Sequence, residues 1–156
     1  MRRNDREITE QKIIKKFIEK QQILRVGFYD ENDIYIVPVN YGYLNIDNNW
    51  SFYFHGARSG RKYELAKKEP IVGFEIDGDY KLLQGENACE FTAKFQSIIG
   101  TGKLQLIECN DEKRKGLNAI MKQVTHKTEW NYSDEMISAV VVFRLDVVKI
   151  SCKANI

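Results

Sequence analysis

The residues best suited to bind a ligand lie together in residues 55–62, which read HGARSGRK. Gly56 and Gly60 can adopt positive φ, which lets backbone N–H groups converge on one point. Arg61 and Lys62 add two full positive charges. A phosphate monoester binds best to several donors and about two positive charges in a small volume, so this stretch predicts a phosphate site. The alternative is a solvated turn with ordinary basic side chains, and the stretch alone leaves it open.

The sequence lacks the residues that several other chemistries require. The chain has neither the glycine-rich turn GxGxxG nor a P-loop, and it shows no hydrolytic constellation. Dinucleotide binding on a Rossmann unit and nucleotide hydrolysis on a P-loop are therefore disfavoured. Met121 and Met136 fit packing better than ligation, and His126, in a polar stretch, is assigned no function.

Composition limits the class of protein further. The chain has 156 residues, of which 43% are hydrophobic and 29% charged, as expected of one globular domain with its own core. Its net charge of only +2 does not favour nucleic-acid binding, so any anion site must be local. Three separated cysteines, Cys89, Cys109 and Cys152, suit a reducing compartment. The first residues contain no apolar run, so we expect no signal peptide, no membrane helix and a cytoplasmic location.

Hydrophobic periodicity predicts the elements that position the 55–62 stretch. We expect helices over residues 10–21, with Thr9 as N-cap, over 61–69, and from Asn110 as N-cap with a core face of Leu117, Ile120, Met121 and Val124. We expect strands over residues 23–28, 34–43, 50–55, 71–76, 88–107 and 137–151. Pro38 cannot donate a ladder hydrogen bond, so its strand is an edge, is bulged, or faces a ligand. Gly100 and Gly102 indicate a bend or bulge.

These elements predict a mainly β (α+β) fold. Six or more antiparallel strands with a few peripheral helices favour a closed or partly closed β-barrel. Residues 139–150 are apolar at more positions than one face of a small barrel can use. We therefore expect a homodimer.

Four segments occur in an order that resembles a known family. They are RRNDREI at residues 2–8, YIVPVNYGY at 35–43, FHGARSGRK at 54–62 and FQSIIGTGK at 95–103. Together they resemble the Nim (5-nitroimidazole resistance) group of the pyridoxamine 5'-phosphate oxidase-like flavoproteins. The resemblance implies that residues 1–156 form one FMN-binding split β-barrel domain. It also implies a homodimer with FMN at the subunit interface.

The resemblance also implies roles for individual residues. Arg61 and Lys62 fall on the pair that holds the FMN phosphate, and His55 falls on a histidine placed near the flavin. His55 is thus the candidate catalytic residue, because imidazole exchanges protons near neutral pH; alternatively, it only hydrogen-bonds the loop. The remaining cofactor-binding residues implied by the resemblance are Val37, Pro38, Val39, Asn40, Phe54, Gly56, Gly60, Gln96 and Ser97.

The implied activity is flavin-dependent reduction of a small electron-poor substrate, such as a nitroaromatic. The chain lacks the basic strand motif and the arginine-rich C-terminal segment of pyridoxine-phosphate oxidases, which argues against vitamin B6 oxidation. It also lacks a C-terminal histidine, which disfavours haem degradation. The partners expected are a second copy and a small molecule, without nucleic acid, membrane or metal. Two alternatives stay open: a flavin or haem carrier without turnover, and a barrel that binds no chromophore.

Overall fold

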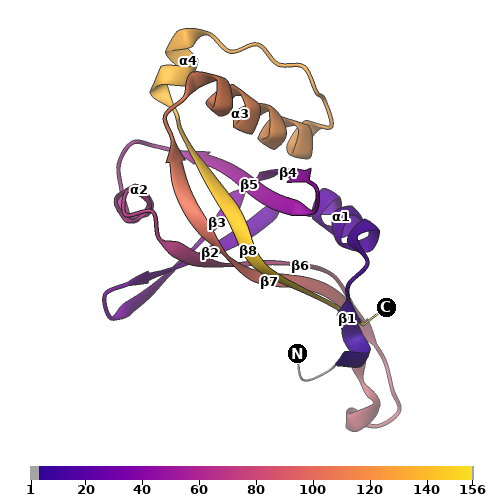
Figure 1. Cartoon of the computed structure of the whole chain (residues 1–156). Coiled ribbons are helices and arrows are strands. Elements are labelled where there is room, and N and C mark those ends of the chain that lie inside the picture. Colours follow the sequence, from indigo (N-terminus) through magenta and orange to yellow (C-terminus); the bar gives the residue numbers. More distant parts are fainter. Residues whose placement is uncertain (1–3, 156) are drawn as a thin grey trace.

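The computed structural model describes residues 4–155, so Arg2 and Arg3 of the opening motif lie outside the described residues. One antiparallel sheet curls into a barrel in the order β3-β2-β6-β7-β8-β5-β4, and β1 also pairs with β8 (Figure 1). The strands are β1 (Glu7–Ile8), β2 (Ile23–Asp30), β3 (Asp33–Asn40), β4 (Gly42–Ile46), β5 (Asn49–Gly56), β6 (Ile71–Leu83), β7 (Thr92–Ile107) and β8 (Val141–Asn155). The helices are α1 (Gln11–Lys20), α2 (Arg61–Ala66), α3 (Asn110–Thr125) and α4 (Asp134–Ala139), with 3-10 turns η1 (Asn4–Arg6) and η2 (Ala88–Glu90). The predicted fold class is confirmed.

The predicted strand over residues 34–43 is in fact two strands at opposite ends of the sheet. The chain leaves β3 at Tyr41, whose buried hydroxyl donates to the Ile18 carbonyl oxygen at 2.7 Å. It re-enters the sheet at Gly42, where a Cβ would lie only 2.1 Å from the backbone of Ala119 in α3. Within the described part of the chain, this break leaves β3 paired with β2 alone. Pro38 therefore lies on an edge strand, one of the three possibilities expected for it.

Three long strands differ from prediction in their ends. β6 continues from the predicted 71–76 to Leu83, with a register shift between Gly78 and Lys81. β7 begins at Thr92 because residues 88–90 form η2, which the Asn87 and Glu90 side chains cap. The bulge expected near Gly100 and Gly102 is present as a register shift between Thr101 and Gly102.

The start of β8 also differs from prediction. The strand expected from residue 137 begins at Val141, because residues 134–139 form α4 instead. Ser133 caps that helix by accepting a hydrogen bond from the Met136 backbone N–H at 3.2 Å. The serine N-cap therefore accounts for the helix that replaces the first residues of the expected strand.

Two predicted helix caps are wrong. α1 begins after Glu10 instead of Thr9, and α3 begins after Cys109 instead of Asn110; neither side chain caps its helix by a hydrogen bond. The core face of α3 is also shifted, because its buried residues include polar ones that bond backbone carbonyls. The buried residues of α3 are Lys113, Gly116, Ile120 and Gln123, so Ile120 is the one residue of the predicted face that is buried. Lys113 and Gln123 donate to backbone carbonyl oxygens.

The hydrophobic residues form two clusters. The larger fills the barrel, and the smaller lies under α3 and joins Tyr53, Ile107, Ile120 and Val142. Val142 of β8 is buried by α3, so the apolar excess of residues 139–150 is partly used within one chain. Within residues 4–155, no helix combines the length and hydrophobicity needed to cross a bilayer.

Candidate functional site

The predicted phosphate loop connects the end of β5 to the start of α2. Gly60 adopts φ of +95° as the residue before α2, a conformation that side chains rarely tolerate. Gly56 does not use a positive φ, but Lys62 lies against it: a Cβ on Gly56 would lie 3.1 Å from the Lys62 Nζ. The two glycines thus serve different needs, a turn at Gly60 and a close approach at Gly56.

Lys62 is a half-buried cation whose surroundings are mainly aromatic. Its Nζ lies 5.5 Å from the centroid of the Phe54 ring and 5.1 Å from that of Phe143, and these two rings stack at 4.9 Å. Burial lowers the pKa of the Lys62 ammonium. Among residues 4–155, no carboxylate lies within ion-pair distance of it, unlike Arg61, which pairs with Asp30 and Asp33, and Lys67, which pairs with Glu64. An anion entering this loop would find a desolvated positive charge.

Arg61 has very different surroundings. Its Nε donates to Asp30 Oδ2 at 2.9 Å and its Nη2 to Asp33 Oδ2 at 2.7 Å. Its guanidinium carbon lies 4.7 Å from the centroid of the Tyr35 ring. The hydrogen bond from Arg61 lowers the pKa of Asp33. No local pattern in the sequence singles out Asp30 or Asp33, so both partners of Arg61 were missed.

His55 lies beside Lys62 on the exposed side of β5. Partial burial and, second, the Lys62 charge lower the pKa of the His55 imidazole. The ring is therefore neutral near neutral pH and can both give and take a proton. The preceding residue, Phe54, is fully buried in the barrel, so within one chain it offers no surface to a ligand.

The predicted ring-binding residues 37–40 lie on the open edge of β3. Val37 and Val39 point toward the core, whereas Pro38 and Asn40 are exposed. Among the described residues, no strand pairs with the second edge of β3, so backbone N–H and C=O groups there are free to meet a ligand. The same strand begins at Asp33, so it also reaches the partner of Arg61.

Gln96 and Ser97 lie far from the loop within one chain. In the strand pairing, Leu106 is level with Phe143, which is level with Phe54. Gln96 is ten residues earlier on β7 than Leu106, roughly 33 Å away along an extended strand. Its side chain is buried and donates to Cys152 Sγ at 3.7 Å. One chain therefore does not bring Gln96 to the phosphate loop.

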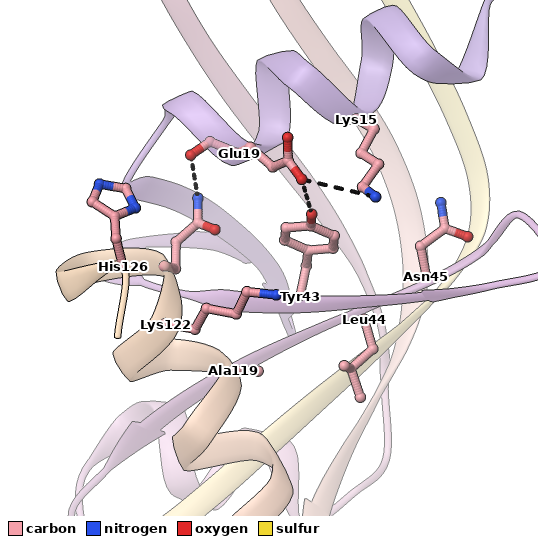
Figure 2. Close-up of a pocket in the computed structure, with 9 residues that line it drawn as sticks. Lys15, Glu19, Tyr43, Leu44, Asn45, Ala119, Lys122 and His126 are labelled. Carbon is pink, nitrogen blue, oxygen red and sulfur yellow. Dashed lines mark hydrogen bonds and ion pairs between the residues drawn. The ribbon is translucent and has the colours of Figure 1, made fainter. Parts of the chain in front are cut away.

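A separate cavity of about 440 Å³ lies between α1, β4 and α3 (Figure 2). It contains none of the predicted site residues, although His126 lines it. Tyr43 donates to Glu19 Oε1 at 2.7 Å, and Gln123 Nε2 donates to the carbonyl oxygen of Ile18 at 2.7 Å. These bonds fix the C-terminal end of α1 against β4 and α3, so the cavity lies at a structural joint.

Comparison with known proteins supports this fold. A model of the pyridoxamine 5'-phosphate oxidase family matches residues 10–154. No curated protein matches the chain significantly. A proposed 5-nitroimidazole antibiotic resistance protein from Bacteroides thetaiotaomicron VPI-5482 has 28% identity and a TM-score of 0.81, over 95% of this chain and 86% of its own.

Two more distant structures share the fold. The flavocytochrome Anf3 from Azotobacter vinelandii has 18% identity and a TM-score of 0.81, over 100% of this chain and 72% of its own. A FAD and haem binding protein from Mycobacterium smegmatis has 12% identity and a TM-score of 0.82, over 96% of this chain and 73% of its own. The split-barrel prediction is thus confirmed, and with a family match across nearly its whole length the chain belongs to the pyridoxamine 5'-phosphate oxidase family.

Proposed function

We propose that the protein is an FMN-dependent oxidoreductase that holds the FMN phosphate on Lys62 and the flavin ring along the free edge of β3. The observation that carries this proposal is the half-buried Lys62 ammonium, which has no carboxylate partner among the described residues. The tight turn at Gly60 and the unpaired edge of β3 fit the two ends of the same ligand. When bound, FMN supplies hydride and electron transfer.

The protein's own groups would then bind, orient and exchange protons. The Lys62 Nζ holds the phosphate, and the backbone of residues 37–40 orients the polar edge of the ring. His55 would relay a proton to the substrate: the lowered pKa leaves the ring neutral, so one nitrogen can take a proton from solvent while the other gives its proton up. The substrate class we propose is a small nitroaromatic, supported by the name of the Bacteroides relative.

A second copy of the chain would complete the site. The outer face of the sheet exposes Ile34, Ile36, Ile71, Ile99 and Val148, which we call the outer apolar face. At its centre Gly27 pairs with Gly73, where an added Cβ would meet no atom closer than 3.8 Å. The chain's own fold does not require glycine there, so we attribute Gly27 and Gly73 to the close approach of a partner. In such a homodimer, Ser97 would reach the flavin of the other copy, whereas Gln96 would do so only by giving up its buried hydrogen bond to Cys152.

A non-enzymatic carrier of flavin or haem is the second candidate. The names of the Azotobacter and Mycobacterium structures, a flavocytochrome and a FAD and haem binding protein, favour it.

The three cysteines are free, which agrees with our proposal that the protein works in the reducing cytoplasm.

The visible spectrum of the purified protein separates these candidates, because flavin, haem and the absence of a chromophore give different absorption. If flavin is present, the protein should be reduced without oxygen and mixed with a nitroimidazole or with buffer. We expect the nitroimidazole to reoxidise the bound flavin and the buffer to leave it reduced. A haem spectrum would favour the carrier, and a colourless protein that cannot be loaded with FMN would refute the proposal.

A further inference from the structure

We propose that the cavity between α1, β4 and α3 binds a free α-amino acid with an apolar side chain. Glu19, Tyr43 and Gln123 hold its ammonium group, and Lys122 holds its carboxylate. The cavity measures about 440 Å³, a volume typical of small-molecule sites (Figure 2). It shares no residue with the FMN site proposed above, so it stands or falls independently of FMN binding.

The strongest indication of a ligand is Gln123, a polar residue that is only 6% exposed and lines the cavity. Its Nε2 donates to the carbonyl oxygens of Ile18, Glu19 and Gln21 at 2.7, 3.3 and 2.6 Å, which identifies the nitrogen end of the amide. The Oε1 has no hydrogen-bond partner among residues 4–155, and it is open to the cavity. An amide oxygen in such a buried setting requires a donor.

Glu19 and Tyr43 add two more acceptors to the same cavity. The Tyr43 hydroxyl donates to Glu19 Oε1 at 2.7 Å. Burial, and then this hydrogen bond, raise the pKa of Tyr43, so the hydroxyl stays protonated and its oxygen keeps lone pairs for another donor. Figure 2 shows the Glu19 carboxylate extending from α1 toward the Tyr43 ring. An ammonium group carries three N–H donors and suits three acceptors, one of them charged.

The cavity also offers a positive charge. Lys122 lines it and has no carboxylate within ion-pair distance among residues 4–155, whereas Lys15 already lies 3.9 Å from Glu19 Oε1. Figure 2 shows Lys122 reaching from α3 toward β4. Both charges of a zwitterion therefore find a counterpart in one cavity.

The side chain of the ligand has an apolar surface to lie on. Leu44 and Ala119 line this cavity, and with Tyr43 and Lys122 they also line a second cavity of about 540 Å³. Because the two cavities share these four residues, they lie side by side. An apolar side chain can thus cover Leu44 and Ala119 and extend from the first cavity into the second.

Ligands with only one of the two charged groups fit less well. A plain carboxylic acid would neutralise Lys122, but it would leave Gln123 Oε1 without a donor and bring a second negative charge toward Glu19. A plain amine would satisfy the acceptors and leave Lys122 unpaired. An α-amino acid meets both demands because it carries both groups on one carbon atom.

The first test uses calorimetric titration of the purified protein with L-leucine and two analogues. 4-Methylpentanoate is leucine without the amino group, and 3-methylbutylamine is leucine without the carboxylate. We expect L-leucine to bind and each analogue to bind about tenfold more weakly, because each loses one set of charge-assisted hydrogen bonds. No binding of L-leucine at millimolar concentration would show that water alone fills the cavity and would overturn the proposal. Equal binding of L-leucine and either analogue would also overturn it.

The second test reverses the charges on the protein. Glu19→Gln should weaken the binding of L-leucine and of the amine about three- to tenfold without weakening that of 4-methylpentanoate. Lys122→Gln should weaken L-leucine and 4-methylpentanoate and spare the amine. Lys115→Gln is the matched control, because Lys115 is an exposed lysine of the same helix that lines the second cavity and not the first.

The pattern across the three ligands decides the matter. Equal losses for all three ligands in Glu19→Gln and in Lys122→Gln would mean that the substitutions act on the joint between α1 and α3, and would overturn the proposal. A loss of L-leucine affinity in Lys115→Gln as large as in Lys122→Gln would do the same. If a variant does not fold, the comparison of the three ligands on the unsubstituted protein still supports or overturns the site.

Discussion

Arg61 and Lys62 show how two adjacent basic residues come to have different surroundings. Their local pattern, with Gly60 before them, is enough to predict an anion site from the sequence. The partners of Arg61 are not predictable in this way. Asp30 and Asp33 come from the β2–β3 hairpin and meet Arg61 only through the tertiary fold. The same is true of Phe143, which joins Lys62 from the far end of the chain.

Replacing Lys62 with Gln should weaken FMN binding about ten- to a hundredfold, because a charge-assisted hydrogen bond contributes about 1.5 to 3 kcal/mol. Riboflavin binding should change much less. Lys67→Gln is the matched control, since Lys67 is the exposed residue directly after α2 and already pairs with Glu64. Equal FMN affinities for wild type and Lys62→Gln, measured by fluorescence titration, would remove Lys62 from the phosphate site.

The pKa of His55 should lie below the usual histidine value in the flavin-free protein, as measured by NMR titration. Lys62→Gln should raise that pKa, because it removes one of the two causes of its depression. Since the folded state resists protonation, the contribution of His55 to stability is present above about pH 6.5 and is lost as pH falls from there through the lowered pKa. If Lys62→Gln leaves the pKa of His55 unchanged, the Lys62 charge does not act on the His55 imidazole.

The catalytic hypothesis for His55 has its own test. His55→Gln keeps hydrogen-bonding capacity but cannot shuttle a proton, so substrate-dependent flavin reoxidation should slow about 10²-fold while flavin stays bound. Stopped-flow absorbance measures this rate. Unchanged reoxidation would make His55 structural, and loss of the flavin would make it a binding residue.

At the scale of elements, the sequence predicts strands well wherever one face is buried. The alternation of Leu24, Val26 and Phe28 identifies β2, because successive side chains face opposite sides of a strand. The break at Tyr41 is not visible in this way: its aromatic and β-branched neighbours continue the pattern of β3 into β4. Only the packing of α3 on Gly42 reveals why the chain changes its place in the sheet.

Gly42→Ala should destabilise the fold by about 3 kcal/mol, because the added Cβ would overlap the α3 backbone, which cannot give way as a side chain could. Gly27→Ala is the control: it is another strand glycine, and its Cβ would meet only the Gly73 carbonyl oxygen at 3.8 Å. Urea unfolding of both variants, measured at concentrations low enough to keep the chain monomeric, should show a large loss for Gly42→Ala alone. Comparable losses would mean that α3 does not rest on Gly42.

At the scale of the whole molecule, the expected homodimer rests on a different surface from the one that the sequence suggested. The apolar excess of residues 139–150 is partly satisfied by α3, which covers Val142. The outer apolar face remains uncovered in the described chain, and it runs across β3, β6, β7 and β8 around the Gly27–Gly73 pair. The sequence could not identify this face, because its residues come from four strands and share no local pattern.

Ile99→Lys should convert the dimer to a monomer, because an interface that covers the outer apolar face would have to desolvate the new ammonium. Ile46→Lys is the control, since Ile46 is 62% exposed, close to the 58% of Ile99, but lies on β4 away from the outer apolar face. Sedimentation should give a monomer for the first variant and a dimer for the second. If Gln96 and Ser97 serve the flavin of the other copy, Ile99→Lys should also weaken the binding of both FMN and riboflavin, because both need the shared ring site. A monomeric Ile99→Lys variant with full flavin affinity would place the whole cofactor site within one chain, and a monomeric wild type would remove the homodimer altogether.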